Sequence, residues 1–319
     1  MLDSLSFLWQ KCDGGVRLLK VYGDTPCPVL PEDIDGEPLT EIGAYCFADK
    51  PPVAGGTMTP CACTDASRLH PICGNFVESV RLPDTVHLLD SAAFYNCRQL
   101  QRVEIGPGID ALGSDLFTNC RSLTCISVRC APDAPTGLRK LLGSISADVE
   151  VEFLDAQGTV TAKLFYPEYF EYLDENTPAH IFNHSIEGEG YRYRQCFRDG
   201  IVQFTEYDAD FPQACIGESA ENLCHIALGR LRWPFALSAE ARARYSGFLT
   251  GHLPDACKPL IAARDLEGLR FLRGLDGLLP EEMTKVAEAC GAAGFGPGAA
   301  LFVAGRHTSR RKTYSFDDL

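Results

Sequence analysis

Apolar residues recur along the first part of the chain at one fixed spacing. A motif of the form apolar-x-x-apolar-x-apolar occurs every 23 residues, as Val77-x-x-Val80-x-Leu82, Leu100-x-x-Val103-x-Ile105 and Leu123-x-x-Ile126-x-Val128. Because alternate side chains of a strand point to the same side, the last two apolar positions of each copy face one core. Stacked copies predict a parallel β-sheet with a ladder of similar side chains inside it, which is a solenoid.

The residues between these strands repeat as well. FYNCR, residues 94–98, returns as FTNCR, residues 117–121, and a degenerate copy at residues 29–47 ends in Phe47. We expect the phenylalanines to fill the core on the wall opposite the strands. We expect the asparagines to hydrogen-bond main-chain groups at the turn and the cysteines to fill the small space beside them.

These motifs are similar to the BspA-type leucine-rich repeat, in particular LPEDIDGEPLTEIGAYCF and VRLPDTVHLLDSAAFYNCRQLQRVEI. The resemblance covers about residues 16–130. It implies a right-handed β-solenoid that binds proteins and offers no catalytic residues to carry over. Many members of the family are exported adhesins, but the N-terminus MLDSLSFLWQKCDGG lacks the pattern of a signal peptide. We therefore expect a cytoplasmic protein here.

The pattern changes after residue 130, and the predicted fold class is α+β. Residues 1–141 form the leucine-rich-repeat solenoid, with a Pro/Gly-rich loop insertion at 51–75 between two turns. Residues 142–319 form a second domain, a β-hairpin followed by mainly helical structure. In VEVEFL-DAQG-TVTAKLFYP, apolar and polar residues alternate on both sides of a turn, which predicts the hairpin and lets it extend or cap the solenoid's sheet.

Helices are predicted to follow Ser219 and Ser238, which are suitable N-cap residues, and Pro234 ends the first of them. Residues 255–305 weakly resemble the stacked helix pairs of ankyrin-type repeats, although the T-P-L-H signature of those repeats is missing.

Charge and cysteine content narrow the range of partners and compartments. The formal net charge is −14, which argues against binding to a phosphate backbone. No run of 18 apolar residues is present, so we expect no membrane partner. The 15 cysteines are spread over the whole chain, which is typical of reduced thiols in a reducing compartment.

One cysteine cluster has ligands suited to zinc. Cys61, Cys63, His70 and Cys73 in the inserted loop would supply three thiolates and one imidazole. The C-x-C spacing is tighter than in most zinc sites, and no second C-x-x-C accompanies it. We therefore expect free thiols and no cofactor, with zinc as the alternative.

Two further patterns lie in the second domain. His180 and His184 would share a face if their segment were helical, and could then hold a metal. GEGYRYRQCF, residues 188–197, could clamp a nucleotide; the simpler interpretation is a strand or turn whose Arg192 and Arg194 pair with nearby carboxylates.

The function predicted from these patterns is a non-enzymatic protein–protein interaction or scaffold protein. Its partner is a protein bound to the solenoid's sheet, where the outward side chains of the last turns recognise it. Those residues are Arg81, Arg102, Glu104, Ser127 and Arg129. The alternative is a metal- or nucleotide-dependent regulatory enzyme or binding module, built on the second domain with His180, His184 and Arg192.

Overall fold

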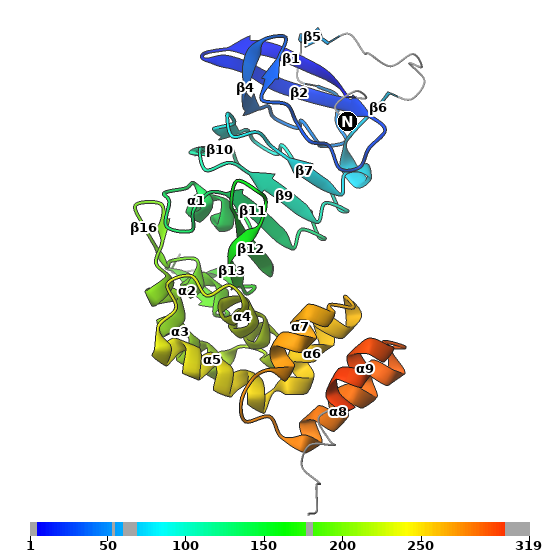
Figure 1. Ribbon diagram of the computed structural model, residues 1–319. Helices are drawn as coiled ribbons and strands as arrows, with labels where there is room; N and C mark the ends of the chain where they lie inside the picture. The colour runs from blue at the N-terminus through cyan, green and yellow to red at the C-terminus, as the bar shows by residue number, and fades with distance from the viewer. Residues whose placement is uncertain (1–4, 53–54, 60–68, 177–180, 304–319) are drawn as a thin grey trace, which may run out of the picture. The chain divides into compact units, whose positions relative to one another are not determined.

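The structure, a computed structural model, describes residues 5–52, 55–59, 69–176 and 181–303. Its contacts divide the chain into two compact units, Met1–Gly217 and Glu218–Leu319. The described part of the first unit holds the strands, three α-helices and a short 3₁₀ helix, and that of the second is helical (Figure 1). This arrangement confirms the predicted α+β class and the N-terminal β-solenoid.

One wall of the solenoid is a five-stranded sheet with the order β13-β12-β11-β9-β7. Its strands are β7 (Ser79–Arg81), β9 (Arg102–Ile105), β11 (Cys125–Arg129), β12 (Val149–Leu154) and β13 (Val160–Tyr166). The first four run parallel, and β13 turns back antiparallel along β12. The alternation of the sequence predicted this hairpin, and of the two arrangements left open the structure shows that it extends the sheet of the repeat.

The register of this sheet stacks equivalent residues of successive turns. Val80, Val103, Ile126, Val151 and Leu164 lie side by side across the five strands. All five are buried in the core. Burial of side chains of this size contributes about 1.5–3 kcal/mol each, so this row holds the turns together.

Eight further strands of the first unit form a second sheet with the main order β10-β8-β4-β2-β1-β5. They are β1 (Ser6–Cys12), β2 (Gly15–Gly23), β3 (Asp33–Ile34), β4 (Glu37–Ile42), β5 (Thr57–Met58), β6 (His70–Pro71), β8 (Leu88–Leu89) and β10 (Ala111–Leu112). In this sheet β4, β8 and β10 run parallel, one from each turn. The antiparallel pair β1–β2 continues the sheet at its N-terminal end.

The phenylalanines at the corner between the two sheets stack on one another. Phe47 and Phe94 have ring centroids 5.0 Å apart, and Phe94 and Phe117 are 5.3 Å apart. These distances are close to the spacing of about 4.8 Å between neighbouring strands. The stack confirms that residues 29–47 are a turn of the same solenoid.

The turn after each phenylalanine differs in part from what we expected. Asn96 and Asn119 adopt left-handed backbone conformations, with φ of 61° and 62°, which asparagine tolerates better than most residues. The amide Nδ2 of Asn119 donates to Oδ1 of Asn96 at 2.8 Å rather than to the main chain. Main-chain acceptors are used by the thiols instead, since Cys97 Sγ donates to Phe47 O and Cys120 Sγ donates to Phe94 O.

The insertion at 51–75 is more than a loop at its two ends. β5 pairs with β1, and β6 pairs with β2. Between β6 and the short 3₁₀ helix Gly74–Phe76, Ile72 is fully buried and its N–H donates to Val21 O. The ends of the insertion are therefore part of the N-terminal sheet and its core.

The predicted boundary at 141/142 falls inside the first compact unit. Residues from there to Gly217 include α1 (Leu138–Gly143), β14 (Phe170–Asn176), β15 (Ile181–Glu187), α2 (Gly190–Tyr193), β16 (Phe197–Arg198), β17 (Ile201–Val202) and α3 (Phe204–Gly217). α1 begins before this boundary and ends after it. Separate folding of residues 1–141 and 142–319 stays a prediction.

The second unit consists of short helices in its described part. They are α4 (Ala220–Arg232), α5 (Ala239–Gly251), α6 (Leu253–Ala262), α7 (Leu266–Arg273), α8 (Pro280–Ala292) and α9 (Gly296–Val303). Ser219 and Ser238 cap α4 and α5 as predicted, each accepting a main-chain N–H at 3.1 Å. α6 packs on α8 and α7 on α9. An ankyrin-type repeat here stays a prediction.

The first testable consequence concerns the phenylalanine stack. Phe94→Ala removes the central ring, which contacts a ring on each side, and should lower the free energy of unfolding by about 3–5 kcal/mol. Phe76→Ala is the matched control, because Phe76 is substantially exposed and should change stability by less than about 0.5 kcal/mol. Urea unfolding followed by circular dichroism measures both. Equal stability of the two variants would contradict the stacked core.

A second consequence concerns the insertion. Ile72→Ala empties a fully buried site and should cost about 2–5 kcal/mol, whereas Pro52→Ala on the exposed part of the insertion should cost less than about 0.5 kcal/mol. Hydrogen exchange should show the loss of protection in β2 and β6 first. If Ile72→Ala leaves the unfolding midpoint unchanged, the insertion is only a loop.

Candidate functional site

The outer face of the five-stranded sheet carries the residues that the sequence selected. Alternation places the polar residues of each strand on the side away from the apolar row. In register across the strands lie two rows, one of Ser79, Arg102, Cys125 and Glu150 and one of Arg81, Glu104, Ser127, Glu152 and Lys163. Side chains in neighbouring strands of such a row are close enough to pair.

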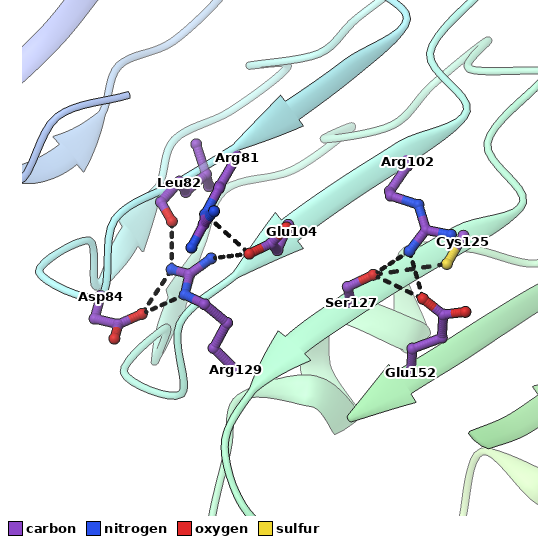
Figure 2. A network of polar contacts seen from close by, with 9 residues as sticks. All are labelled: Arg81, Leu82, Asp84, Arg102, Glu104, Cys125, Ser127, Arg129 and Glu152. Carbon is purple, nitrogen blue, oxygen red and sulfur yellow. Dashed lines mark hydrogen bonds and ion pairs between the residues drawn. The ribbon is translucent and has the colours of Figure 1, made fainter. Parts of the chain in front are cut away.

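The first group of this face centres on Arg129. Its guanidinium donates to Glu104 at 2.8 Å, to Asp84 at 2.6 Å and to the carbonyl of Leu82. Glu104 also pairs with Arg81 at 3.0 Å. Figure 2 shows Arg129 between its acceptors, with Arg81 reaching Glu104 from the neighbouring strand. One carboxylate thus fixes two guanidinium groups.

The second group centres on Glu152. Arg102 donates to both Glu152 and Ser127, with its Nη1 2.6 Å from the serine Oγ, as Figure 2 shows. Lys163 pairs with Glu150 at 2.7 Å and with Glu152 at 2.8 Å. Burial by itself raises the pKa of Glu152, but the hydrogen bonds from Arg102 and Lys163 outweigh it and hold the pKa at about 2, below the ordinary value of 4.5.

Exposure separates the five candidate residues into two kinds. The side chains of Arg81 and Arg102 are 52% and 42% exposed, so they can contact another molecule. Glu104 and Arg129 are mostly covered, and Ser127 is completely buried. The buried members therefore position the exposed arginines. Binding by any of the five stays a prediction.

Sequence reasoning missed the carboxylates and the lysine that complete these groups. Glu150 and Glu152 were visible as the polar positions of VEVEFL, and Lys163 as a polar position of the following strand. What the alternation did not say was that β12 would lie beside β11, which the register now shows. With that pairing known, the three residues would have followed.

This face also holds a group with atoms that could ligate a metal. One ligand atom each from Cys125, Glu150 and Glu152 lies within 4.8 Å of the others. Both carboxylates, however, are already paired with Lys163, and Arg102 binds Glu152 as well. Burial raises the pKa of the Cys125 thiol to about 12, which disfavours the thiolate that a metal binds. The chemistry of this group fits an ion-pair network.

The predicted zinc ligands are only partly described. Cys61 and Cys63 lie outside the described residues. His70 is exposed on β6, and Cys73 is half-buried at the end of the insertion. Burial raises the pKa of the Cys73 thiol. Zinc at this cluster stays an untested alternative.

The second-domain candidates lie on different elements from those expected. His184 is on β15, an extended strand, so the helical arrangement with His180 is wrong for this residue; His180 itself lies outside the described residues. Nε2 of His184 is 3.4 Å from Glu171 on β14. Arg192 is on the short helix α2 rather than on a strand or turn, and pairs with Glu189 at 3.3 Å as predicted.

In the described part of the chain, the guanidinium of Arg194 hydrogen-bonds to main-chain carbonyls, where the prediction had it pair with carboxylates. The residue is buried, and its guanidinium donates to five main-chain carbonyls, those of Leu142, Ile145, Ala147, Pro167 and Gly190. Burial lowers the pKa of Arg194 to about 10, so the side chain stays charged at neutral pH. It ties together the segments that follow the solenoid, and this is a structural role.

Residues 73–133 match the family described as BspA type leucine rich repeat region, with six copies. The match covers β7, β9 and β11, and so includes all five candidate residues of the face.

The chain is similar in part to a solved structure. The latter is the crystal structure of a leucine-rich repeat protein of T. pallidum, 22% identical, and the match covers 38% of this chain and 50% of that one with a TM-score of 0.29. The chain thus spans about half the length of that protein. No curated protein matches the chain. In the described residues, no helix combines the length and apolar character needed to span a bilayer.

The low pKa of Glu152 gives a prediction about pH. Because the folded pKa is below the unfolded one, the stabilisation from Glu152 is complete above about pH 4.5 and is lost as the pH falls towards 2. Glu152→Gln should therefore lower the free energy of unfolding by about 2–3 kcal/mol at pH 7, and its difference from wild type should shrink below pH 4.5. Denaturant unfolding at pH 7, 5 and 3 measures this.

The control for this experiment is Glu206→Gln. Glu206 also pairs with an arginine, Arg198 at 2.8 Å, but both side chains are exposed. Loss of an exposed pair should cost less than about 1 kcal/mol. A Glu152→Gln variant as stable as this control at every pH would contradict the network.

Proposed function

We propose that this chain is a non-enzymatic protein-interaction module and that its partner binds the outer face of the five-stranded sheet. The observation that carries the proposal is the pair of exposed guanidinium groups, Arg81 and Arg102. Arg81 is fixed by Glu104 of the neighbouring strand, and Arg102 by Glu152 two strands away. Arginine is enriched among the residues that dominate protein interfaces. A side chain already fixed in place loses less conformational entropy on binding.

The chemistry of the face indicates what the partner offers. A guanidinium has five N–H donors, and the contacts of Arg81 and Arg102 leave further donors for an acceptor on the partner. A carboxylate or a main-chain carbonyl of a protein fits these donors. The net charge of −14 disfavours a polyanionic partner such as nucleic acid.

The properties of this face suit the binding of a partner better than they suit catalysis. Its acids are held in ion pairs, and burial keeps the thiol of Cys125 protonated at neutral pH. These properties favour a fixed recognition surface, since a nucleophile or a general base needs a pKa near the working pH. The leucine-rich repeat region at 73–133 supports the same interpretation.

We also propose that the protein is located in a reducing compartment, the cytoplasm. The thiols of Cys97 and Cys120 each donate to the carbonyl of a phenylalanine in the preceding turn. Only a reduced thiol can make this contact, so the solenoid's own packing uses the reduced form.

Arg81 gives a sharp test, because its removal leaves Glu104 still paired with Arg129. A photo-reactive residue placed at Ser79, which neighbours Arg81 on the same strand, should crosslink the partner in native lysate. Adding Arg81→Ala should lower the crosslinked yield at least about 10-fold, the effect of losing an important interface arginine. Quantitative mass spectrometry of the crosslinked protein measures the yield.

The matched control is Arg98→Ala. Arg98 is equally an exposed arginine of the repeat region, but it lies on the turn after the phenylalanine stack and outside the sheet. Its loss should leave the crosslinked yield unchanged. Equal yields from the two variants would show that the sheet face is not the binding surface.

A further inference from the structure

A hairpin beyond the repeat forms a sheet of its own. β14 and β15 pair antiparallel over seven residues each, from Phe170 opposite Glu187 to Asn176 opposite Ile181. In the described part of the chain, neither strand pairs with any other. Both outer edges therefore carry main-chain donors and acceptors that a further strand could use.

This hairpin exposes large apolar side chains on both of its faces. Phe170 and Tyr172 alternate onto one face, are 49% and 44% exposed, and have ring centroids 6.4 Å apart. Leu173, 69% exposed, and Ile186, 36% exposed, lie on the other face. A two-stranded hairpin cannot bury both of its faces by itself and is only marginally stable alone. Clustered exposed apolar residues of this kind mark interaction sites.

Acidic residues predominate on and around the hairpin, although Glu189 pairs with Arg192 and Glu171 lies 3.4 Å from His184. From residue 164 to residue 191 the sequence contains six acids and no Lys or Arg; the acids are Glu168, Glu171, Asp174, Glu175, Glu187 and Glu189. Glu171 and Glu187 are exposed on opposite faces, beside the apolar side chains. The hairpin therefore combines apolar contact area with a strong negative field.

We propose that the β14–β15 hairpin docks an extended, basic segment of a partner protein, which adds as a third strand along the free edge of β14. β14 carries three of the four exposed apolar side chains named above. In strand addition, main-chain hydrogen bonds supply affinity and alternate side chains supply specificity. The matching segment alternates apolar residues with Lys or Arg.

The negative charge of the hairpin favours a basic segment of a partner protein over a second copy of the chain, nucleic acid or an anionic membrane. A second copy of the chain would bring the same acidic hairpin against this one. Nucleic acid and anionic membranes carry the same sign as the hairpin and are repelled at the ionic strength of the cell. This surface is separate from the sheet face proposed above, so each proposal stands or falls on its own residues.

The experiment measures binding of short synthetic peptides to the full chain by fluorescence anisotropy. The probe alternates valine and lysine, and its control carries glutamate in place of each lysine. We expect the lysine peptide to bind at least about 10-fold more tightly than the glutamate peptide, with affinity that falls as salt rises. N-methylation of alternate amides of the lysine peptide should weaken binding by a similar factor, because it removes strand hydrogen bonds.

Two variants of the hairpin separate its contributions. Phe170→Ala with Tyr172→Ala should weaken binding of the lysine peptide about 10-fold or more, and so should Glu171→Lys with Glu187→Lys. The matched control combines Leu279→Ala and Glu281→Lys, an exposed apolar residue and an exposed acid at the start of α8 in the second unit. This control should bind as wild type does.

Four results would overturn the proposal. The first is a lysine peptide that binds no better than the glutamate peptide, and the second is full affinity in both hairpin variants. The third is sedimentation that shows a dimer in wild type and a monomer in the Phe170→Ala, Tyr172→Ala variant, since the occupant would then be a second copy. Full affinity of the N-methylated peptide would overturn strand addition itself.

Discussion

Parallel stacking of equivalent side chains is the constraint on which the first unit depends. Each turn buries its apolar residues only against the turns beside it, as the phenylalanine stack of Phe47, Phe94 and Phe117 shows. The thiols of Cys97 and Cys120 follow the same rule and donate to a carbonyl one turn back. A residue type that fits at one turn therefore fits at the next, and this explains why the sequence repeats.

The same register produces the outer face. When strands stack in register on the inside, the outward residues also form rows, and opposite charges in neighbouring strands can pair. Arg102 reaches Glu152 across the intervening strand β11, and Arg129 reaches Asp84 in the same way. The exposed arginines are thereby held by the scaffold that the buried rows define. The register of the stacked strands therefore determines both the packing of the core and the arrangement of the charged side chains on the outer face.

The solenoid also needs an end, and β12 and β13 supply it. β12 joins β11 in parallel, and β13 turns back antiparallel along its other side. Beyond it, Arg194 donates to five main-chain carbonyls in and around α1 and α2 and so joins these segments. The free strand edges of β14 and β15 contrast with this, because in the described part of the chain nothing is added to them.

The sequence by itself determined the solenoid, its strands, the phenylalanine stack, the hairpin at 149–166 and the caps at Ser219 and Ser238, because periodicity and local capping depend on neighbouring residues. Only the tertiary structure decided which polar residues meet. The burial of Ser127, the pairing of Arg102 with Glu152 and the core position of Ile72 each join residues that are distant in sequence. Strand order sets such contacts, and a pattern within one strand carries no record of its neighbours.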